Sequence, residues 1–160
     1  FIRRAYGVSK KEVSSYPLIH TGAVLSGIIY VDRPNSDSRH QAKTQIEENL
    51  RINRSILIFP EGTTSNTPET KPFRKGSFEA AANSDHAVVP FALEMGKPET
   101  DFWFEESLMG LYFKTFSKWR TDVYLHFFDP INGTSGDQLA RQAETMINEK
   151  IKEFQQNWKN

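Results

Sequence analysis

Apolar and polar positions alternate along this chain in blocks that predict alternating strands and helices. Short apolar blocks rich in branched residues, typical of strands, cover residues 27–31, 55–59, 87–93 and 122–128. Between and after them, apolar residues recur every three or four positions, the period of a helix with one buried face. We therefore expect about five pieces of sheet, three or four helices, and an α/β fold with a mixed, mostly parallel sheet flanked by helices.

Four segments carry the helical pattern. The first follows the capping side chains of residues 35–37 and places Ala42, Ile46 and Leu50 on one face. A short helix is expected from residue 76 to 82, and an aromatic-rich one within residues 102–119. The pattern is clearest near the carboxyl end, where six apolar residues recur at helical spacing: Leu139, Ala143, Ile147, Ile151, Phe154 and Trp158.

Two of the strand blocks have features that predict their place in the sheet. Residues 55–59 are almost wholly apolar, which predicts a strand buried on both faces of a parallel sheet. Pro90 lies inside the block at 87–93, and because proline cannot donate to a strand ladder, this strand is expected at an edge or a bulge.

Composition bounds the remaining possibilities. A chain of 160 residues supports one domain with one sizeable core. Its 20 basic and 20 acidic residues balance to zero, which argues against nucleic acid as a partner. Cysteine is absent, so disulfides and thiolate nucleophiles are excluded, and no apolar run approaches the ~20 residues of a membrane span. The chain begins with phenylalanine, and we expect residues 1–160 to form a single, N-terminally truncated domain.

The chemistry of the chain concentrates in one polar loop after the strand at 55–59. It contains Glu61, Gly62, Thr63, Thr64 and Ser65, directly past the carboxyl end of a strand, where open α/β sheets bind ligands. Glycine lets a backbone approach an anion, and amides and hydroxyls can donate to phosphate oxygens, while the glutamate is expected to orient a basic partner or the loop itself. The alternative is a turn whose hydroxyls satisfy only local backbone groups.

Several blocks in a fixed order resemble the glycerol-phosphate and lysophosphatidate acyltransferase family. Residues 27–33 are similar to the family's second block, an apolar strand ending in Asp-Arg, and residues 59–65 to its third, Phe-Pro-Glu-Gly-Thr. Residues 71–78 resemble the stretch after the third block, residues 88–91 the fourth, and residues 127–131 a late strand. The similarity covers roughly residues 8 to 150 and implies the α/β fold of these enzymes.

The resemblance implies roles for individual residues. Arg33 and the loop at 61–65 would hold the phosphate of the acceptor, although a surface ion pair with a nearby aspartate is an alternative for the arginine. Lys71, Arg74 and Lys75 would approach the same phosphate, the acyl donor or anionic lipid, or form an ordinary solvated cluster. Pro90 would shape the substrate groove without taking part in chemistry.

The implied activity is an O-acyltransferase that moves a fatty acyl chain from acyl-CoA or acyl carrier protein to a lysophospholipid hydroxyl, with no cofactor and no metal. The expected partners are the lyso-lipid acceptor, the acyl thioester donor and a membrane surface, at the cytoplasmic face of a membrane such as the bacterial inner membrane. Two stretches with aromatic and basic residues are candidates for contact with that surface, residues 1–11 and 102–119.

Two departures from the family's pattern change these expectations. The family's catalytic His-x-x-x-x-Asp block is missing, because His20, His40, His86 and His126 all lack an aspartate five positions later. That block is expected upstream of Phe1, so no catalytic residue is assigned in this chain and the chain alone is expected to be inactive.

The second departure is Thr64, which stands where phosphatidate-forming members usually carry arginine. A lyso-aminolipid acceptor is therefore an alternative to lysophosphatidate. A non-catalytic relative that binds lipid or phosphate is the alternative to acyl transfer itself, and a His followed five residues later by Asp upstream of Phe1 would favour the enzyme.

Overall fold

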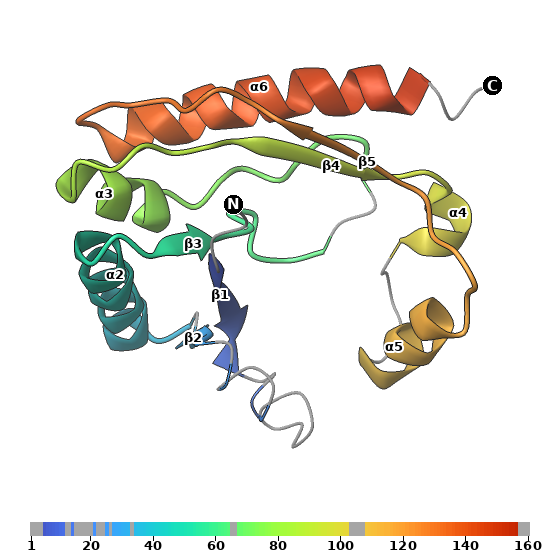
Figure 1. Ribbon diagram of the computed structural model, residues 1–160, viewed down its shortest axis with the longest axis horizontal. Coiled ribbons are helices and arrows are strands. Elements are labelled where there is room, and N and C mark those ends of the chain that lie inside the picture. The colour runs from blue at the N-terminus through green and yellow to red at the C-terminus, as the bar shows by residue number, and fades with distance from the viewer. Residues whose placement is uncertain are drawn as a thin grey trace.

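A computed structural model describes residues 5–11, 14, 21, 25, 27–32, 34–64, 67–102 and 108–156, with residues 108 and 109 described by their backbone alone. It confirms a mixed α/β architecture (Figure 1). The strands form two sheets rather than the expected single one. Three strands make a parallel sheet and two make an antiparallel sheet.

The parallel sheet has the order β2-β1-β3. Its central strand, β1 (Ala5–Lys10), pairs with β2 (Ile29–Val31) on one side and β3 (Ser55–Leu57) on the other. In a parallel sheet all strands end at the same edge, so the chain leaving β2 and the loop leaving β3 start from one edge, with β1 between them. The pattern of apolar positions did not predict β1, and the segment considered for membrane contact at 1–11 is a sheet strand at Ala5–Lys10.

The antiparallel sheet pairs β4 (Phe91–Met95) with β5 (Val123–Phe127). An isolated bridge between Val88 and Ile131 continues this pairing backward from β4. Pro90 is buried between the bridge and the strand, and its carbonyl accepts the backbone N–H of Phe128. The prediction of an edge strand or a bulge is confirmed for the edge, since β4 pairs with β5 alone among the described strands.

The helices follow the predicted order, and most of their bounds are close to prediction. They are α2 (Ser36–Arg51), α3 (Gly76–Asn83), α4 (Pro98–Asp101), α5 (Leu108–Phe116) and α6 (Gly136–Gln156). Asn35 caps α2 as expected, because its side-chain oxygen accepts the N–H groups of Asp37 and Ser38. The four-residue α4 was not predicted. None of the helices in the described ranges is long and apolar enough to cross a membrane.

The helices pack in layers that share α3 (Figure 1). α6 runs along the antiparallel sheet and lies beside α3, while α2 lies on the other side of α3 and contacts β2 and β3. Gly136, at the start of α6, has no room for a side chain, because a Cβ there would come within 2.5 Å of the Glu79 backbone nitrogen. A glycine at this position therefore permits the close approach of α6 to α3.

Two clusters of buried side chains make up the core. One joins α3 to α6 and consists of Phe78, Ile131, Leu139, Ala140 and Ala143, and the other joins α2 and α3 to the parallel sheet and consists of Ile29, Ala42, Ile46 and Ala80. α3 contributes to both, so the clusters form one continuous body.

The expectation that the strand at 55–59 is buried on both faces was wrong. Ile56 packs against the cluster beneath α2, whereas Leu57 on the opposite face is 40% exposed. The reason is that the described helices cover one face of the parallel sheet only. An apolar run cannot show how many of its faces are covered.

Candidate functional site

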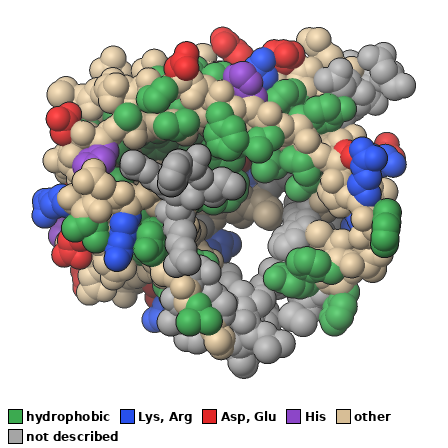
Figure 2. Space-filling model, viewed as in Figure 1, with side chains coloured by type: hydrophobic (Ala, Val, Ile, Leu, Met, Phe, Trp, Pro, Cys, Tyr) green, Lys and Arg blue, Asp and Glu red, His purple; other side chains and the backbone are tan. Residues whose placement is uncertain are grey.

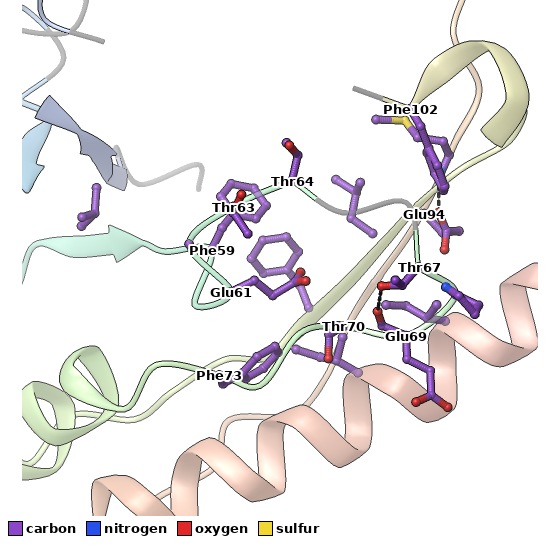
Figure 3. Close-up of a pocket in the computed structure, with 18 of the residues that line it drawn as sticks. Phe59, Glu61, Thr63, Thr64, Thr67, Glu69, Thr70, Phe73, Glu94 and Phe102 are labelled. Carbon is purple, nitrogen blue, oxygen red and sulfur yellow. Dashed lines mark hydrogen bonds between the residues drawn. The ribbon is translucent and has the colours of Figure 1, made fainter. Parts of the chain in front are cut away.

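A cavity of about 690 Å³ opens where the loop after β3 meets β4 and α6 (Figure 3). One wall is the loop itself, from Phe59 through Thr64 and again from Thr67 to Thr70, and Phe73 follows it. The end of β1 contributes residues 8–10, and β4 and α6 close the remaining sides. The cavity thus lies at the carboxyl edge of the parallel sheet, as the sequence predicted for a ligand site.

The loop begins with a tight turn fixed by backbone hydrogen bonds. The N–H of Gly62 donates to the carbonyl of Phe59 over 3.0 Å, and Gly62 is buried with a φ of 72°, a conformation that favours glycine. Glu61 accepts the backbone N–H of Lys71 at 2.8 Å through its Oε2. The glutamate therefore ties the two ends of the loop together, one of the two roles that its residue type suggested.

The two threonines that follow the turn are the donors that this loop offers to a ligand. Thr63 and Thr64 are exposed and line the cavity, and neither hydroxyl makes a hydrogen bond within the described part of the chain. The Gly62 amide is already engaged by Phe59. The hydroxyls of Thr63 and Thr64 are thus polar groups that this end of the cavity can offer to a ligand.

The second half of the loop is fixed to α6 by side-chain hydrogen bonds. Asn148 accepts the backbone N–H of Thr70 at 2.9 Å and donates to the Thr70 hydroxyl at 2.9 Å. One helical turn earlier, Glu144 accepts the N–H of Phe73 at 2.8 Å. Because residues four apart share a helix face, α6 presents a polar row that satisfies the loop backbone.

The wall opposite the threonines is apolar and belongs to β4. Phe91, Leu93 and Met95 alternate onto the face that lines the cavity. The ring of Phe59 meets the ring of Phe91 edge to face with 5.7 Å between centroids, and so joins the loop to this wall. The cavity thus offers hydroxyls at the turn and an apolar surface on β4, which suits a molecule with a polar head and an apolar chain.

The charged residues of the described lining are one lysine and three glutamates: Lys10, Glu61, Glu69 and Glu94. Burial raises the pKa of Glu94, while hydrogen bonds from Gln155 and from the Met95 backbone act in the opposite direction. Gln155 also donates to the carbonyl of Pro68 at 2.8 Å. Glu94 therefore joins β4, α6 and the loop at one corner of the cavity.

Histidine does not line the cavity in the described residues. The described residues also contain no group of three histidine, aspartate or glutamate side chains that could hold a metal ion. His126 lies opposite Ala92 in the antiparallel sheet, and its ring packs edge to face on Phe128.

The structure brings together four of the residues predicted for the site: Glu61, Gly62, Thr63 and Thr64. Arg33 and Ser65 lie outside the described residues. Lys71 and Lys75 are exposed and Pro90 is buried, and none of the three lines the cavity. For Lys71 it is the backbone that takes part, through the bond to Glu61.

Several lining residues were not singled out from the sequence. Lys10 sits at the end of the unpredicted β1, and Ile147 and Ile151 come from α6. The helical period identified the two isoleucines as core residues but could not show that they also border a cavity. Phe91, directly after Pro90, carried the one usable signal, because it belongs to the block at 88–91.

Comparisons with known proteins agree on one family. The family model described as "Acyltransferase" matches residues 2–94. The lyso-ornithine lipid O-acyltransferase of Pseudomonas aeruginosa is 30% identical over 147 residues, covering 88% of this chain and 57% of that protein. The chloroplastic 1-acyl-sn-glycerol-3-phosphate acyltransferase LPAT1 of Arabidopsis thaliana is 28% identical over 144 residues, which cover 90% of this chain and 38% of that protein.

A solved structure supports the fold. The 1-acyl-sn-glycerophosphate acyltransferase PlsC from Thermotoga maritima superposes with a TM-score of 0.64 at 19% identity, covering 97% of this chain and 58% of that one. The chain thus spans between about two fifths and three fifths of the length of these relatives. Because the family model matches more than half of the chain, this chain belongs to the acyltransferase family.

Proposed function

We propose that the whole protein transfers a fatty acyl chain from an acyl thioester to the hydroxyl of a lyso-lipid. The observation that carries this is the two-sided cavity, with free threonine hydroxyls at the turn and an apolar wall on β4. The reaction joins the acceptor oxygen to the acyl carbon and breaks the carbon–sulfur bond of the thioester. The acceptor proton ends on the leaving thiol, so the overall step needs neither an oxidant nor a cofactor.

In this proposal the residues of this chain bind and orient, and the base comes from elsewhere in the whole protein. Thr63 and Thr64 donate hydrogen bonds to the polar head, and the wall of Phe91, Leu93 and Met95 holds an acyl chain. Supporting an outside base is the lack of histidine among the described cavity residues. The 160-residue chain alone is then expected to give no turnover with acyl-CoA or acyl carrier protein as donor.

Arg33 is the proposed partner of an acceptor phosphate. Support comes from the sheet order, because the chain after β2 and the loop after β3 leave the same edge with one strand between them. Adjacent strands lie about 4.8 Å apart, so two strands separated by a third are about 10 Å apart, within reach of an arginine side chain and a bound phosphate together. Lys71 and Lys75 would meet an anion only outside this cavity.

A second class of acceptor, a lyso-lipid with an amine-bearing head, is favoured by the charges of the lining. Three glutamates and one lysine are present among the described lining residues, and Thr64 adds no positive charge. One of the similar proteins acts, by its name, on lyso-ornithine lipid. The proposed location, the cytoplasmic face of a bacterial inner membrane, suits both classes of acceptor.

Acyl transfer by the whole protein should be measured with lysophosphatidate and with lyso-ornithine lipid as parallel acceptors. Replacing both Thr63 and Thr64 by valine should raise the acceptor KM about thirtyfold, since each of the two lost hydrogen bonds costs about 1 kcal/mol. Thr145→Val, an exposed position on α6, is the matched control. Unchanged acceptor KM would remove the role of the turn, and lipid binding without any transfer would favour a non-catalytic binder.

Thr64→Arg separates the two acceptor classes. An added guanidinium should favour lysophosphatidate over lyso-ornithine lipid if the head lies at this turn, because arginine binds phosphate through two parallel hydrogen bonds. A ratio of kcat/KM values that stays the same for the two acceptors would place the head elsewhere.

A further inference from the structure

α5 carries an aromatic surface that the cavity does not use. It consists of Tyr112, Phe113 and Phe116 on the helix and Trp119 just beyond it. Phe113 and Phe116 are 69% and 70% exposed, and Trp119 is fully exposed. Residues three and four apart share a helix face, so the rings form one stripe, in which the rings of Tyr112 and Phe116 are tilted against each other with 4.7 Å between centroids. In the space-filling view, hydrophobic side chains gather over α5 at the lower right (Figure 2).

The orientation of α5 is held by contacts on the side away from these rings. Leu111 is buried, and just after the helix the ammonium of Lys118 donates to the carboxylate of Asp101 and, at 2.6 Å, to the carbonyl of Thr100. Asp101 is itself buried, and the lysine holds its pKa below the usual value. The ion pair therefore sets which face of α5 turns toward the body and which turns away.

Nothing in the described part of the chain covers the stripe. A helix of nine residues gains little from its own hydrogen bonds and is stabilised chiefly by what its apolar face packs against. A group of large exposed rings on one element is uncommon on a monomeric soluble surface and marks a site of interaction.

The residue types indicate a bilayer interface as the occupant. Tryptophan and tyrosine prefer the headgroup level of a membrane, where one part of the ring is apolar and the other wet. The segment 108–120 contains three basic residues and no acidic one: Lys114, Lys118 and Arg120. Lys118 and Arg120 pair with Asp101 and Asp122, so insertion of the rings should dominate the binding.

We propose that α5 docks this protein on a membrane surface by inserting Phe113, Phe116 and Trp119 to headgroup depth. The proposal rests on the proposed function in one respect, because an enzyme acting on a lyso-lipid must take its acceptor from a bilayer. The interface would then hold α5 at the place where the substrate is found. The docking itself is a physical property and can be measured without turnover.

The test follows Trp119 in the full 160-residue chain after Trp103 and Trp158 are replaced by phenylalanine. With vesicles of phosphatidylcholine containing phosphatidylglycerol, the emission of Trp119 should shift to shorter wavelength and be quenched by brominated acyl chains. The double variant Phe113→Ser/Phe116→Ser should weaken vesicle partitioning at least tenfold, since binding scales with buried apolar area. Ile52→Ser, at the 60% exposed end of α2, is the matched control and should bind like the parent chain.

Trp119 emission that stays unshifted and unquenched in every vesicle would overturn the proposal. So would a double variant that partitions as well as the Ile52→Ser control, or sedimentation showing that the stripe pairs two copies of the chain instead. The activity of the whole protein separates this proposal from the proposed function. If Trp119 inserts into vesicles but the whole protein acylates no lyso-lipid, the proposed function is refuted and the membrane docking stands. If the whole protein acylates a lyso-lipid while Trp119 remains in water, the docking is refuted and the proposed function stands.

Discussion

α6 and α5 both present apolar residues at helical spacing, but the protein treats the two faces in opposite ways. The 21 residues of α6 lay Leu139, Ala140 and Ala143 into the core against α3. The nine residues of α5 bury Leu111 and leave Phe113 and Phe116 exposed. Periodicity therefore predicts which face of a helix is apolar, whereas the surrounding fold decides whether protein or something else covers it.

The two helices also differ in the work of their polar residues. On α6, Glu144 and Asn148 accept hydrogen bonds from the backbone of the loop that follows β3. Those near α5 hold the helix in place, through Lys118 and Asp101. One helix thus shapes the site from within, and the other is positioned so that its rings remain available.

The largest effect expected is on the buried face of α6. Leu139 is 1% exposed within the α3–α6 cluster, so Leu139→Ala should lower the free energy of unfolding by about 3 kcal/mol and the Tm by roughly 6 to 12 °C. Phe116→Ala on α5 should change it by less than about 0.5 kcal/mol, because its ring is open to solvent. Thermal unfolding of both variants checks this, and similar losses would show that the stripe is covered after all.

The second largest effect on the free energy of unfolding is expected at the ion pair of Lys118 and Asp101, which holds α5 in place. Asp101→Asn should cost about 2 kcal/mol, because it removes a charge-assisted pair whose carboxylate is buried. The exposed pair of Arg120 and Asp122 provides the control, and Asp122→Asn should cost under about 0.5 kcal/mol. Urea unfolding at neutral pH measures both.

The pH dependence of this anchor has a definite sign. Lys118 lowers the pKa of Asp101 below its value of 3.8 in the unfolded chain, so the stabilisation is fully present above about pH 4. It is lost as the pH falls through the folded pKa. The difference in the free energy of unfolding between the parent and Asp101→Asn should therefore become smaller in acid. A difference that stays constant from pH 7 to pH 3 would contradict the assigned ion pair.

A substitution in the polar row of α6 should lower the free energy of unfolding by less, and it should also weaken acceptor binding. Asn148→Ala removes two hydrogen bonds to Thr70 and should cost about 1 to 2 kcal/mol. Because Thr70 lines the cavity, the acceptor KM of the whole protein should rise more than kcat falls. Gln142→Ala, on the exposed face of α6, should leave both quantities unchanged, and equal effects at the two positions would remove the role of the row.

Local patterns predicted much of the fold because they report on local physics. The cap at Asn35, the buried face of Ala42 and Ile46, and the long final helix were all visible in spacing and residue type. β1 was not, because Ala5–Lys10 mixes small, polar and charged residues around a glycine and so lacks the apolar run of a buried strand. Its place at the centre of the sheet depends on partners that are distant in the chain.

The site divides in the same way. The turn from Glu61 to Thr64 could be identified from sequence because its residues are contiguous and follow a strand end. The contribution of Asn148 could not, since this residue meets Thr70 from 78 positions away. Lys71 and Lys75 are close to the loop in sequence, but they are not among the residues that line the cavity, and their contact with an anion stays a prediction.

Glu94 lies where the end of α6 meets β4. Its replacement should have the smallest effect on the free energy of unfolding, and that effect should depend on pH in a specific way. Burial raises its pKa above 4.5, so the folded protein holds a proton that the unfolded chain has released at the same pH. Stability should therefore fall slightly as the pH rises through the window between the unfolded and folded pKa. Glu94→Gln, which cannot ionise, should remove that slope while changing stability by under about 1 kcal/mol.

The control for Glu94 is the exposed Glu99→Gln, which should leave the slope intact. Chemical unfolding of the three proteins from pH 4 to 8 compares them directly. A slope that survives in Glu94→Gln would mean that another group titrates in this range. A slope lost in that variant alone would show that the α6 side of the molecule is closed enough to disfavour a single charge, in contrast to the open face of α5.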